Sequence, residues 1–250
     1  MTPGRFVVAF VLIVAAALAL VTRPETSMDH AAFVQADPFA DPPGSPRIAV
    51  LGTSLTARYN WPAVLGEALS ACLGKPAALD VVAAAGQTSD WGLDQVERLI
   101  AQRPDVVLVE FTVNDADMRR GLSPRDSLRR HADIIAALHA ALPQTRIVLI
   151  GTNPMFGLRG LLRWRMAAYL QNYVALAQSD PRVGFVDLAP EWRATIRTRG
   201  RSEVMADGVH PVALAARQVM VPLLAQTVAA LWDCPCSCVT RDCAAFALAR

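Results

Sequence analysis

Short, continuous apolar runs alternate with segments of helical periodicity along most of the chain. The apolar runs, rich in Val, Ile and Leu, lie at residues 47–51, 79–85, 105–111, 146–151 and 183–187. The segments with apolar residues at helical spacing lie at 61–73, 93–102, 124–142, 158–178 and 211–231. Because the runs are continuous rather than alternating, we expect strands that are buried on both faces. Such alternation predicts an α/β protein, a three-layer α/β/α sandwich around a central, mainly parallel sheet.

The N-terminal region carries a different kind of apolar segment. After the basic side chain Arg5, residues 6–21 form an unbroken apolar run. As a helix this run would rise about 24 Å, less than the ~30 Å hydrocarbon core of a bilayer. Its length and the Ala-x-Ala sequence at 17–19 favour a secretory signal peptide, and an uncleaved membrane anchor is the alternative. In either case residues 1–22 predict export to the periplasm, the periplasmic face of the inner membrane or the medium.

Two further segments flank the predicted domain, which spans residues 47–232. Residues 23–46 hold five of the 17 prolines and no sustained apolar period, which predicts an extended linker. The tail, 233–250, contains cysteines at 234, 236, 238 and 243. Their spacing does not match the usual zinc motifs, and disulfides within the tail are expected, with the pairing open. Cys72 would then be the remaining thiol, buried in the first helix.

Composition narrows the classes of function. With 53% hydrophobic and 18% charged residues, the chain of 250 residues can form one large folded domain. The formal net charge of +2 gives no reason to expect a nucleic-acid partner. The sequence lacks the motifs G-x-S-x-G, G-x-G-x-x-G, the P-loop and H-E-x-x-H. These absences argue against an α/β-hydrolase, a dinucleotide- or nucleotide-binding protein and a zinc protease.

Polar residues follow the predicted strand ends. Three such segments lie at residues 52–55, 86–88 and 112–115, and a fourth polar segment, 207–211, precedes the last predicted helix. Because ligands bind at the carboxyl ends of parallel strands, these segments are expected to converge. Together they supply the Ser54 hydroxyl, the Gly86 amide, the Asn114 carboxamide and the pair Asp207–His210.

These groups suit acyl transfer through a serine nucleophile. A Ser hydroxyl attacks a carbonyl effectively once a base removes its proton, and His has a suitable pKa. Asp207 lies three residues before His210, a spacing at which its carboxylate can orient the ring. Taken singly, Ser54 and Asp207 also fit helix caps and Asn114 fits a turn. Their common register favours catalysis over these alternatives.

The four segments, in this order, resemble the motif blocks of the SGNH (GDSL) serine hydrolase family over about residues 47–231. The resemblance implies a flavodoxin-like SGNH hydrolase fold, with Ser54 as nucleophile and His210 and Asp207 as its partners. It also implies an oxyanion hole formed by the amides of Ser54 and Gly86 and the carboxamide of Asn114. No metal or cofactor is implied.

Details of the motifs refine the resemblance. The stretches 51–62 and 81–93 are most similar to small bacterial periplasmic thioesterase/lysophospholipase-like members. Thr53 stands where the family usually has Asp, with little expected loss because that Asp is not catalytic. Thr112 stands where the family usually has Gly, which is expected to affect the size of the substrate pocket.

The sequence therefore predicts a serine esterase that hydrolyses ester or thioester bonds of small acyl substrates, either lipids or acylated glycans. The alternatives are a carbohydrate O-acetylesterase acting on envelope polysaccharide, and a non-catalytic lipid- or polysaccharide-binding module of the same fold. Contact with a membrane is expected only through an uncleaved N-terminal segment. Two arginine clusters, at 119–130 and 159–165, fit either solvated helix faces or an anionic substrate. His131 and His139 are expected to be structural.

Overall fold

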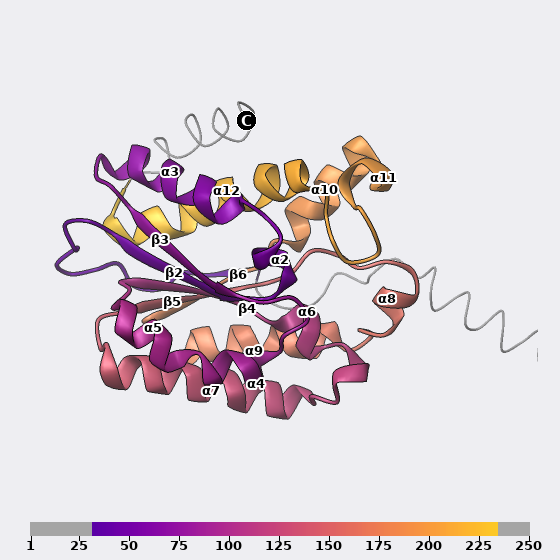
Figure 1. Cartoon of the computed structure of the whole chain (residues 1–250), viewed down its shortest axis with the longest axis horizontal. Helices are drawn as coiled ribbons and strands as arrows, with labels where there is room; N and C mark the ends of the chain where they lie inside the picture. Colours follow the sequence, from indigo (N-terminus) through magenta and orange to yellow (C-terminus); the bar gives the residue numbers. More distant parts are fainter. Residues whose placement is uncertain (1–31, 235–250) are drawn as a thin grey trace, which may run out of the picture.

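A six-stranded sheet lies at the centre of the part that the computed structural model describes, residues 32–234 (Figure 1). Its strands, in the order in which they pair, are β1 (Phe33–Val34), β6 (Val183–Val186), β5 (Arg146–Ile150), β4 (Val106–Glu110), β2 (Arg47–Gly52) and β3 (Ala78–Ala83). All neighbours run parallel except β1, which is antiparallel to β6. This arrangement confirms the predicted mainly parallel sheet.

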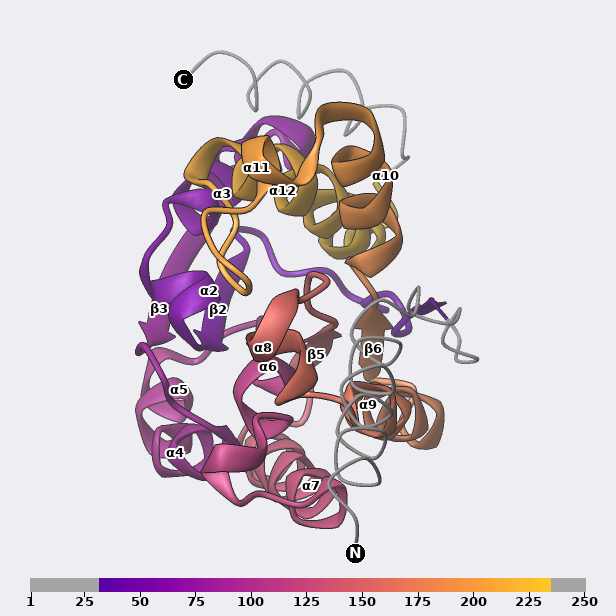
Figure 2. The same cartoon turned by 90° about the vertical axis from the view of Figure 1, so that its right-hand side faces the viewer.

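Helices cover both faces of the sheet (Figures 1 and 2). One layer contains α3 (Trp61–Leu73), α10 (Ala189–Arg199), α11 (Arg201–Val204) and α12 (Ala213–Ala229). The other contains α4 (Ser89–Asp94), α5 (Val96–Gln102), α7 (Pro124–Ala141) and α9 (Met166–Ser179). The shorter helices are α2 (Ser54–Ala57), α6 (Thr112–Asp115), α8 (Gly157–Leu161), η1 (Met118–Arg120) and η2 (Ala230–Trp232). The three-layer α/β/α sandwich is thus confirmed.

Each inner strand contributes side chains to two hydrophobic cores. In β2, Ile48 and Val50 pack into the core under α3 and α12, whereas Ala49 and Leu51 pack into the core on the opposite face. The prediction of strands buried on both faces is therefore correct for β2, β4, β5 and β6. It is wrong for β3, where Val81 is 41% exposed, because β3 is an edge strand.

The segment predicted as a linker takes part in the fold. Phe33 and Val34 form β1 opposite Val186 and Phe185, and Ala36 and Phe39 are buried. The linker prediction is wrong for residues 33–39, since these few apolar side chains suffice to add an edge strand and to cover the core. The predicted signal peptide or anchor, the first part of the linker and most of the Cys-rich tail lie outside the described residues, and export stays a prediction.

One helix within residues 32–234 is long and apolar enough to cross a membrane. It runs from Ala213 to Trp232, combining α12 and η2, and 61% of its most apolar window is buried inside the protein. It packs against α3 and contributes Val219, Leu224 and Val228 to the core. Its apolar composition therefore reflects its place in the interior of the sandwich.

The end of this helical segment meets α3 through two cysteines. The Sγ atoms of Cys72 and Cys234 lie 2.8 Å apart, and both side chains are half-buried. Cys72 lies in α3, as predicted, and its contact with Cys234 is a pairing that the sequence analysis did not consider. The cysteines at 236, 238 and 243 lie outside the described residues, so disulfides within the tail stay a prediction. Packing of α3 on α12 brings two sulfurs together across 162 positions of sequence.

We expect Cys72 and Cys234 to form a disulfide when the purified protein is equilibrated with an oxidised dithiol buffer. Such a crosslink closes a long loop, and it should stabilise the folded state by about 2–4 kcal/mol. Peptide mass spectrometry without reductant, and Tm with and without reductant, measure both effects. Cys72→Ser should remove the linked peptide and the reductant effect on Tm. Peptides that join Cys234 only to Cys236, Cys238 or Cys243 would contradict the pairing.

Candidate active site

The serine predicted as nucleophile lies at the turn between β2 and α2. Thr53 caps α2, because its hydroxyl accepts a hydrogen bond from the amide of Leu55 at 3.3 Å. Ser54 therefore does not serve as the cap, and its hydroxyl is free for another partner. Only 6% of Ser54 is exposed. The turn thus presents a nearly buried hydroxyl at the carboxyl end of a central strand.

Three predicted residues stand in a hydrogen-bonded line. The Oγ atom of Ser54 lies 3.0 Å from Nε2 of His210, and Nδ1 of His210 lies 3.0 Å from Oδ2 of Asp207. A carboxylate can only accept, so Nδ1 carries the proton and Nε2 accepts from the Ser54 hydroxyl. Residues 156 positions apart in sequence are brought together in the geometry that activates a serine.

The turn that carries Asp207 is held by its own carboxylate. Oδ1 of Asp207 accepts from the amides of Val209 and His210, at 2.6 and 2.8 Å. Partial burial works to raise the pKa of Asp207, but these amides and the His210 ring outweigh it and hold the pKa well below its usual value. The carboxylate is therefore ionised at neutral pH.

The predicted oxyanion donors lie after the two strands next to β2. Gly86 follows β3 with a φ of 78°, a conformation that favours glycine. Asn114 lies in α6 after β4, and its Nδ2 donates to the carbonyl of Gln87 at 2.7 Å. This hydrogen bond holds the loop that contains Gly86, and the Asn114 carboxamide has a second N–H that can donate to another acceptor. Thr112 is buried at the start of the same helix, and its hydroxyl has no partner within residues 32–234.

A buried carboxylate that the sequence analysis missed lies beneath the Ser54 turn. Glu110, the last residue of β4, is 4% exposed. Its Oε1 accepts from the Thr53 amide at 2.7 Å and from the Thr56 hydroxyl at 2.9 Å, and the Thr53 hydroxyl lies 3.0 Å from both carboxylate oxygens. An Asp at 53 would place a second carboxylate there, whereas the Thr hydroxyl donates. The sequence feature that could have indicated this role is the acidic residue Glu110 inside the apolar run 105–111.

Gly52 is closely packed against the Glu110 carboxyl and the Thr56 hydroxyl. A Cβ on Gly52 would lie 2.6 Å from Oε1 of Glu110 and 2.7 Å from Oγ1 of Thr56, so only glycine fits. Burial raises the pKa of Glu110 to about 7, although hydrogen bonds from Thr53 and Thr56 work in the opposite direction.

A second buried network holds the loop on the other side of Asn114. Asp115 accepts from the amide and hydroxyl of Ser89 at 2.9 and 2.6 Å, and from the hydroxyl of Ser127 at 2.6 Å. It thereby joins α4, α6 and α7. His131 contacts the Ser127 carbonyl at 2.8 Å and the Tyr173 hydroxyl at 2.8 Å, so it is structural, as predicted.

The arginine clusters separate into different environments. Arg119 and Arg163 both bind the carboxylate of Asp117, which is 2% exposed. The Arg119 hydrogen bond overcomes burial and lowers the pKa of Asp117 to about 2. Arg159, on α8, lies 3.7 Å from Asp207. The interpretation of these arginines as solvated helix faces is wrong for Arg163, which is buried.

Comparison with known proteins agrees with this fold and site. The chain belongs to the GDSL-like lipase/acylhydrolase family, whose model matches residues 50–217. It is therefore a serine hydrolase that acts on ester bonds, with the SGNH fold. No curated protein matches the chain.

Three solved structures illustrate the likeness of fold. The lipase/acylhydrolase from Enterococcus faecalis is 20% identical, with a TM-score of 0.56 over 75% of this chain and 94% of that one. TesA is 22% identical, with a TM-score of 0.56 over 74% and 97%. A catalytic mutant of the acetylxylan esterase Axe2 from Geobacillus stearothermophilus is 18% identical, with a TM-score of 0.60 over 76% and 95%.

The raised pKa of Glu110 predicts how stability depends on pH. Between pH 4.5 and about 7, folded Glu110 is protonated while the unfolded carboxyl is ionised, so its contribution to stability falls as pH rises. The free energy of unfolding of the unchanged protein minus that of Glu110→Gln should decrease over this window, by on the order of 3 kcal/mol. Urea unfolding at several pH values measures it.

A matched control for this pH series is Glu97→Gln, at an exposed position on α5. Its difference in unfolding free energy from the unchanged protein should stay nearly constant. A constant difference for Glu110→Gln as well would show that Glu110 is ionised in the folded protein throughout.

Proposed function

We propose that the protein hydrolyses esters or thioesters of small acyl substrates, with Ser54 as the nucleophile. The observation that carries this proposal is the line of two 3.0 Å contacts from the Ser54 hydroxyl through His210 to Asp207. It agrees with the family, whose members include acylhydrolases.

The reaction would proceed in two acyl transfers. Oγ of Ser54 attacks the acyl carbon while its proton passes to Nε2 of His210, and Asp207 stabilises the imidazolium. The negative oxygen of the tetrahedral intermediate accepts from the amides of Ser54 and Gly86 and from the carboxamide of Asn114. His210 then protonates the leaving oxygen or sulfur. Water, deprotonated by His210, attacks the acyl-enzyme and releases the acid and free Ser54.

Apolar side chains at the edge of the site support a substrate with an apolar part. The turn containing Gly208 packs on α8, since the amide of Phe156 donates to the Gly208 carbonyl at 2.9 Å. Beside this contact, Leu158 is 71% and Trp164 is 70% exposed. Met118, which is 62% exposed, lies close to the end of α8, because its amide donates to the carbonyl of Leu162 at 3.0 Å. We call Met118, Leu158, Leu161 and Trp164 the apolar lip.

The second candidate is a carbohydrate O-acetylesterase. It is favoured by the likeness to an acetylxylan esterase and by the exposed Trp164, since an indole face can stack on a sugar ring. Turnover of acetylated oligosaccharides and of longer acyl esters by the same preparation separates the two candidates.

The nucleophile can be tested with a fluorophosphonate probe on the full chain. We expect covalent labelling of Ser54, mapped by mass spectrometry, and a rate of labelling that falls on the order of 10³-fold or more in His210→Ala. Ser179→Ala, an exposed serine on α9, should label at the rate of the unchanged protein. A folded His210→Ala variant that labels at the normal rate would contradict activation by His210 and favour a non-catalytic module.

The apolar lip predicts a dependence on acyl length. Leu158→Ser combined with Trp164→Ser should raise KM several-fold for octanoyl esters, because apolar area is lost, and change it little for acetyl esters. Steady-state kinetics on a 4-nitrophenyl ester series measures this dependence. Phe33→Ser, which removes an apolar side chain that is 49% exposed on β1, is the matched control and should leave KM unchanged. Equal effects on acetyl and octanoyl esters would argue that the lip does not bind the acyl chain.

A further inference from the structure

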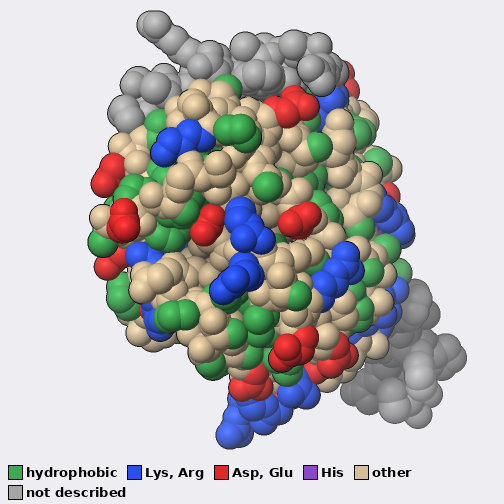
Figure 3. All heavy atoms as spheres, turned by 60° about the vertical axis from the view of Figure 1, so that its left-hand side comes forward, with side chains coloured by type: hydrophobic (Ala, Val, Ile, Leu, Met, Phe, Trp, Pro, Cys, Tyr) green, Lys and Arg blue, Asp and Glu red, His purple; other side chains and the backbone are tan. Residues whose placement is uncertain are grey.

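One guanidinium at the site has no acidic partner. Arg119 and Arg163 share Asp117, and Arg159 approaches Asp207. Arg120 is exposed, and within residues 32–234 its side chain makes no ion pair or hydrogen bond. On the face shown in Figure 3, by contrast, basic side chains are interspersed with acidic ones.

The backbone of Arg120 is fixed relative to Asn114. The amide of Asp117 donates to the Asn114 carbonyl at 3.1 Å, and the amide of Arg120 donates to the Asp117 carbonyl at 2.8 Å. The Asp117 side chain is locked in turn by the buried Arg163 at 2.8 Å. Arg120 follows Asn114 by six residues, and the hydrogen-bonded turn of η1 therefore fixes the position of its backbone relative to the Asn114 carboxamide.

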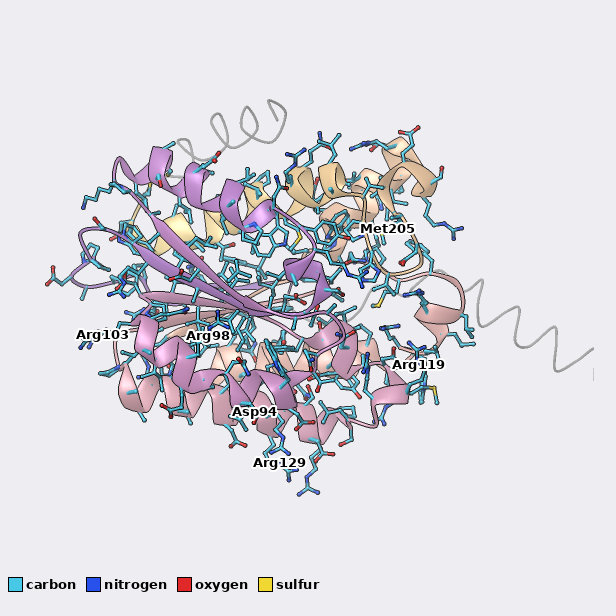
Figure 4. All side chains as sticks on the ribbon, viewed as in Figure 1. Asp94, Arg98, Arg103, Arg119, Arg129 and Met205 are labelled. Carbon is cyan, nitrogen blue, oxygen red and sulfur yellow. The ribbon has the colours of Figure 1, made fainter. Side chains whose placement is uncertain are left out.

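The Arg120 guanidinium reaches the other oxyanion loop. Its Nη2 lies 3.0 Å from the position that a Cβ on Gly86 would occupy. The Gly86 loop is thus contacted by Asn114, through the Gln87 carbonyl, and by Arg120. Figure 4 places the neighbouring Arg119 at the same end of the sheet as Met205, which lies on the segment leading to His210, and places Arg103 at the opposite end. The positive charge of Arg120 therefore lies beside the Gly86 loop, which carries one of the predicted oxyanion donors.

We propose that Arg120 binds an anionic group of the substrate, a carboxylate or a phosphate, close to the scissile acyl group. This inference rests on the proposed function, because it places the anion relative to the acyl carbon that Ser54 attacks. A guanidinium binds carboxylate and phosphate through paired N–H donors, and here no protein carboxylate competes for it. Arg120 thus acts as a specificity residue that favours esters of acidic compounds over neutral ones.

The test uses pairs of esters that differ only in charge. The first pair is 4-acetoxybenzoate and 4-acetoxybenzamide, with the charge on the leaving group. The second is phenyl hydrogen adipate and phenyl 5-carbamoylpentanoate, with the charge on the acyl group. In Arg120→Gln, kcat/KM for the charged member of at least one pair should fall roughly 10- to 100-fold, and its neutral member should change less than about twofold.

Two further variants separate charge from position. Arg120→Lys keeps the charge and should retain part of the preference for the charged member. Arg98→Gln removes the same charge from an exposed position on α5, which Figure 4 shows away from Arg119, and should leave both members unchanged. Competitive inhibition by phenyl phosphate that is lost in Arg120→Gln would identify phosphate, rather than carboxylate, as the preferred anion.

Equal losses on the charged and neutral members would overturn the proposal and assign Arg120 to the oxyanion itself or to the shape of the Gly86 loop. No loss on any ester would also overturn it. Failure of the proposed function is distinguishable, since it appears as absence of hydrolysis of all four esters by the unchanged protein. In that case calorimetric binding of 4-hydroxybenzoate, compared with 4-hydroxybenzamide, decides the anion site independently of turnover.

Discussion

The Ser54 turn depends on one buried contact, the carboxylate of Glu110 beneath it. The Thr53 amide and the hydroxyls of Thr53 and Thr56 all donate to this side chain, which comes from the neighbouring strand. A carboxyl buried in this way is costly unless its hydrogen bonds are made, so the turn cannot shift without leaving it unsatisfied. The position of the Ser54 hydroxyl therefore depends on the contact with Glu110 of β4 as well as on the helix α2.

Asp115 holds the part of the candidate site that contains Asn114 in a similar way. It joins Ser89, at the start of α4, to Ser127 on α7, and it is adjacent in sequence to Asn114. The side chains of Glu110 and Asp115 each bind groups on neighbouring elements, at the carboxyl ends of the parallel strands. In the proposed mechanism, the oxyanion donors and the nucleophile are consequently held in place before a substrate arrives, which is the condition for electrostatic stabilisation of a transition state.

The sequence predicted the parts of this site that stand at strand ends. Periodicity located β2, β3 and β4, and the parallel sheet required the polar segments after them to converge. Glu110 and Asp115 could not be predicted in the same way, because their roles depend on which hydroxyls lie across the interior, and periodicity carries no such information. The same holds for Cys72, whose neighbour Cys234 is set by the packing of α3 on α12. The linker was misjudged because proline content outweighed the few apolar residues that pair with β6.

The antiparallel direction of β1 sets where the chain enters the domain. The carbonyl of Ala32 accepts from the amide of Asp187, just beyond the carboxyl end of β6. Everything that precedes Ala32 therefore attaches at the end of the sheet that also carries Ser54. The entry point of the chain and Ser54 therefore share one end of the sheet, so a label or support coupled just before residue 32 would lie on the side of the candidate site rather than behind it.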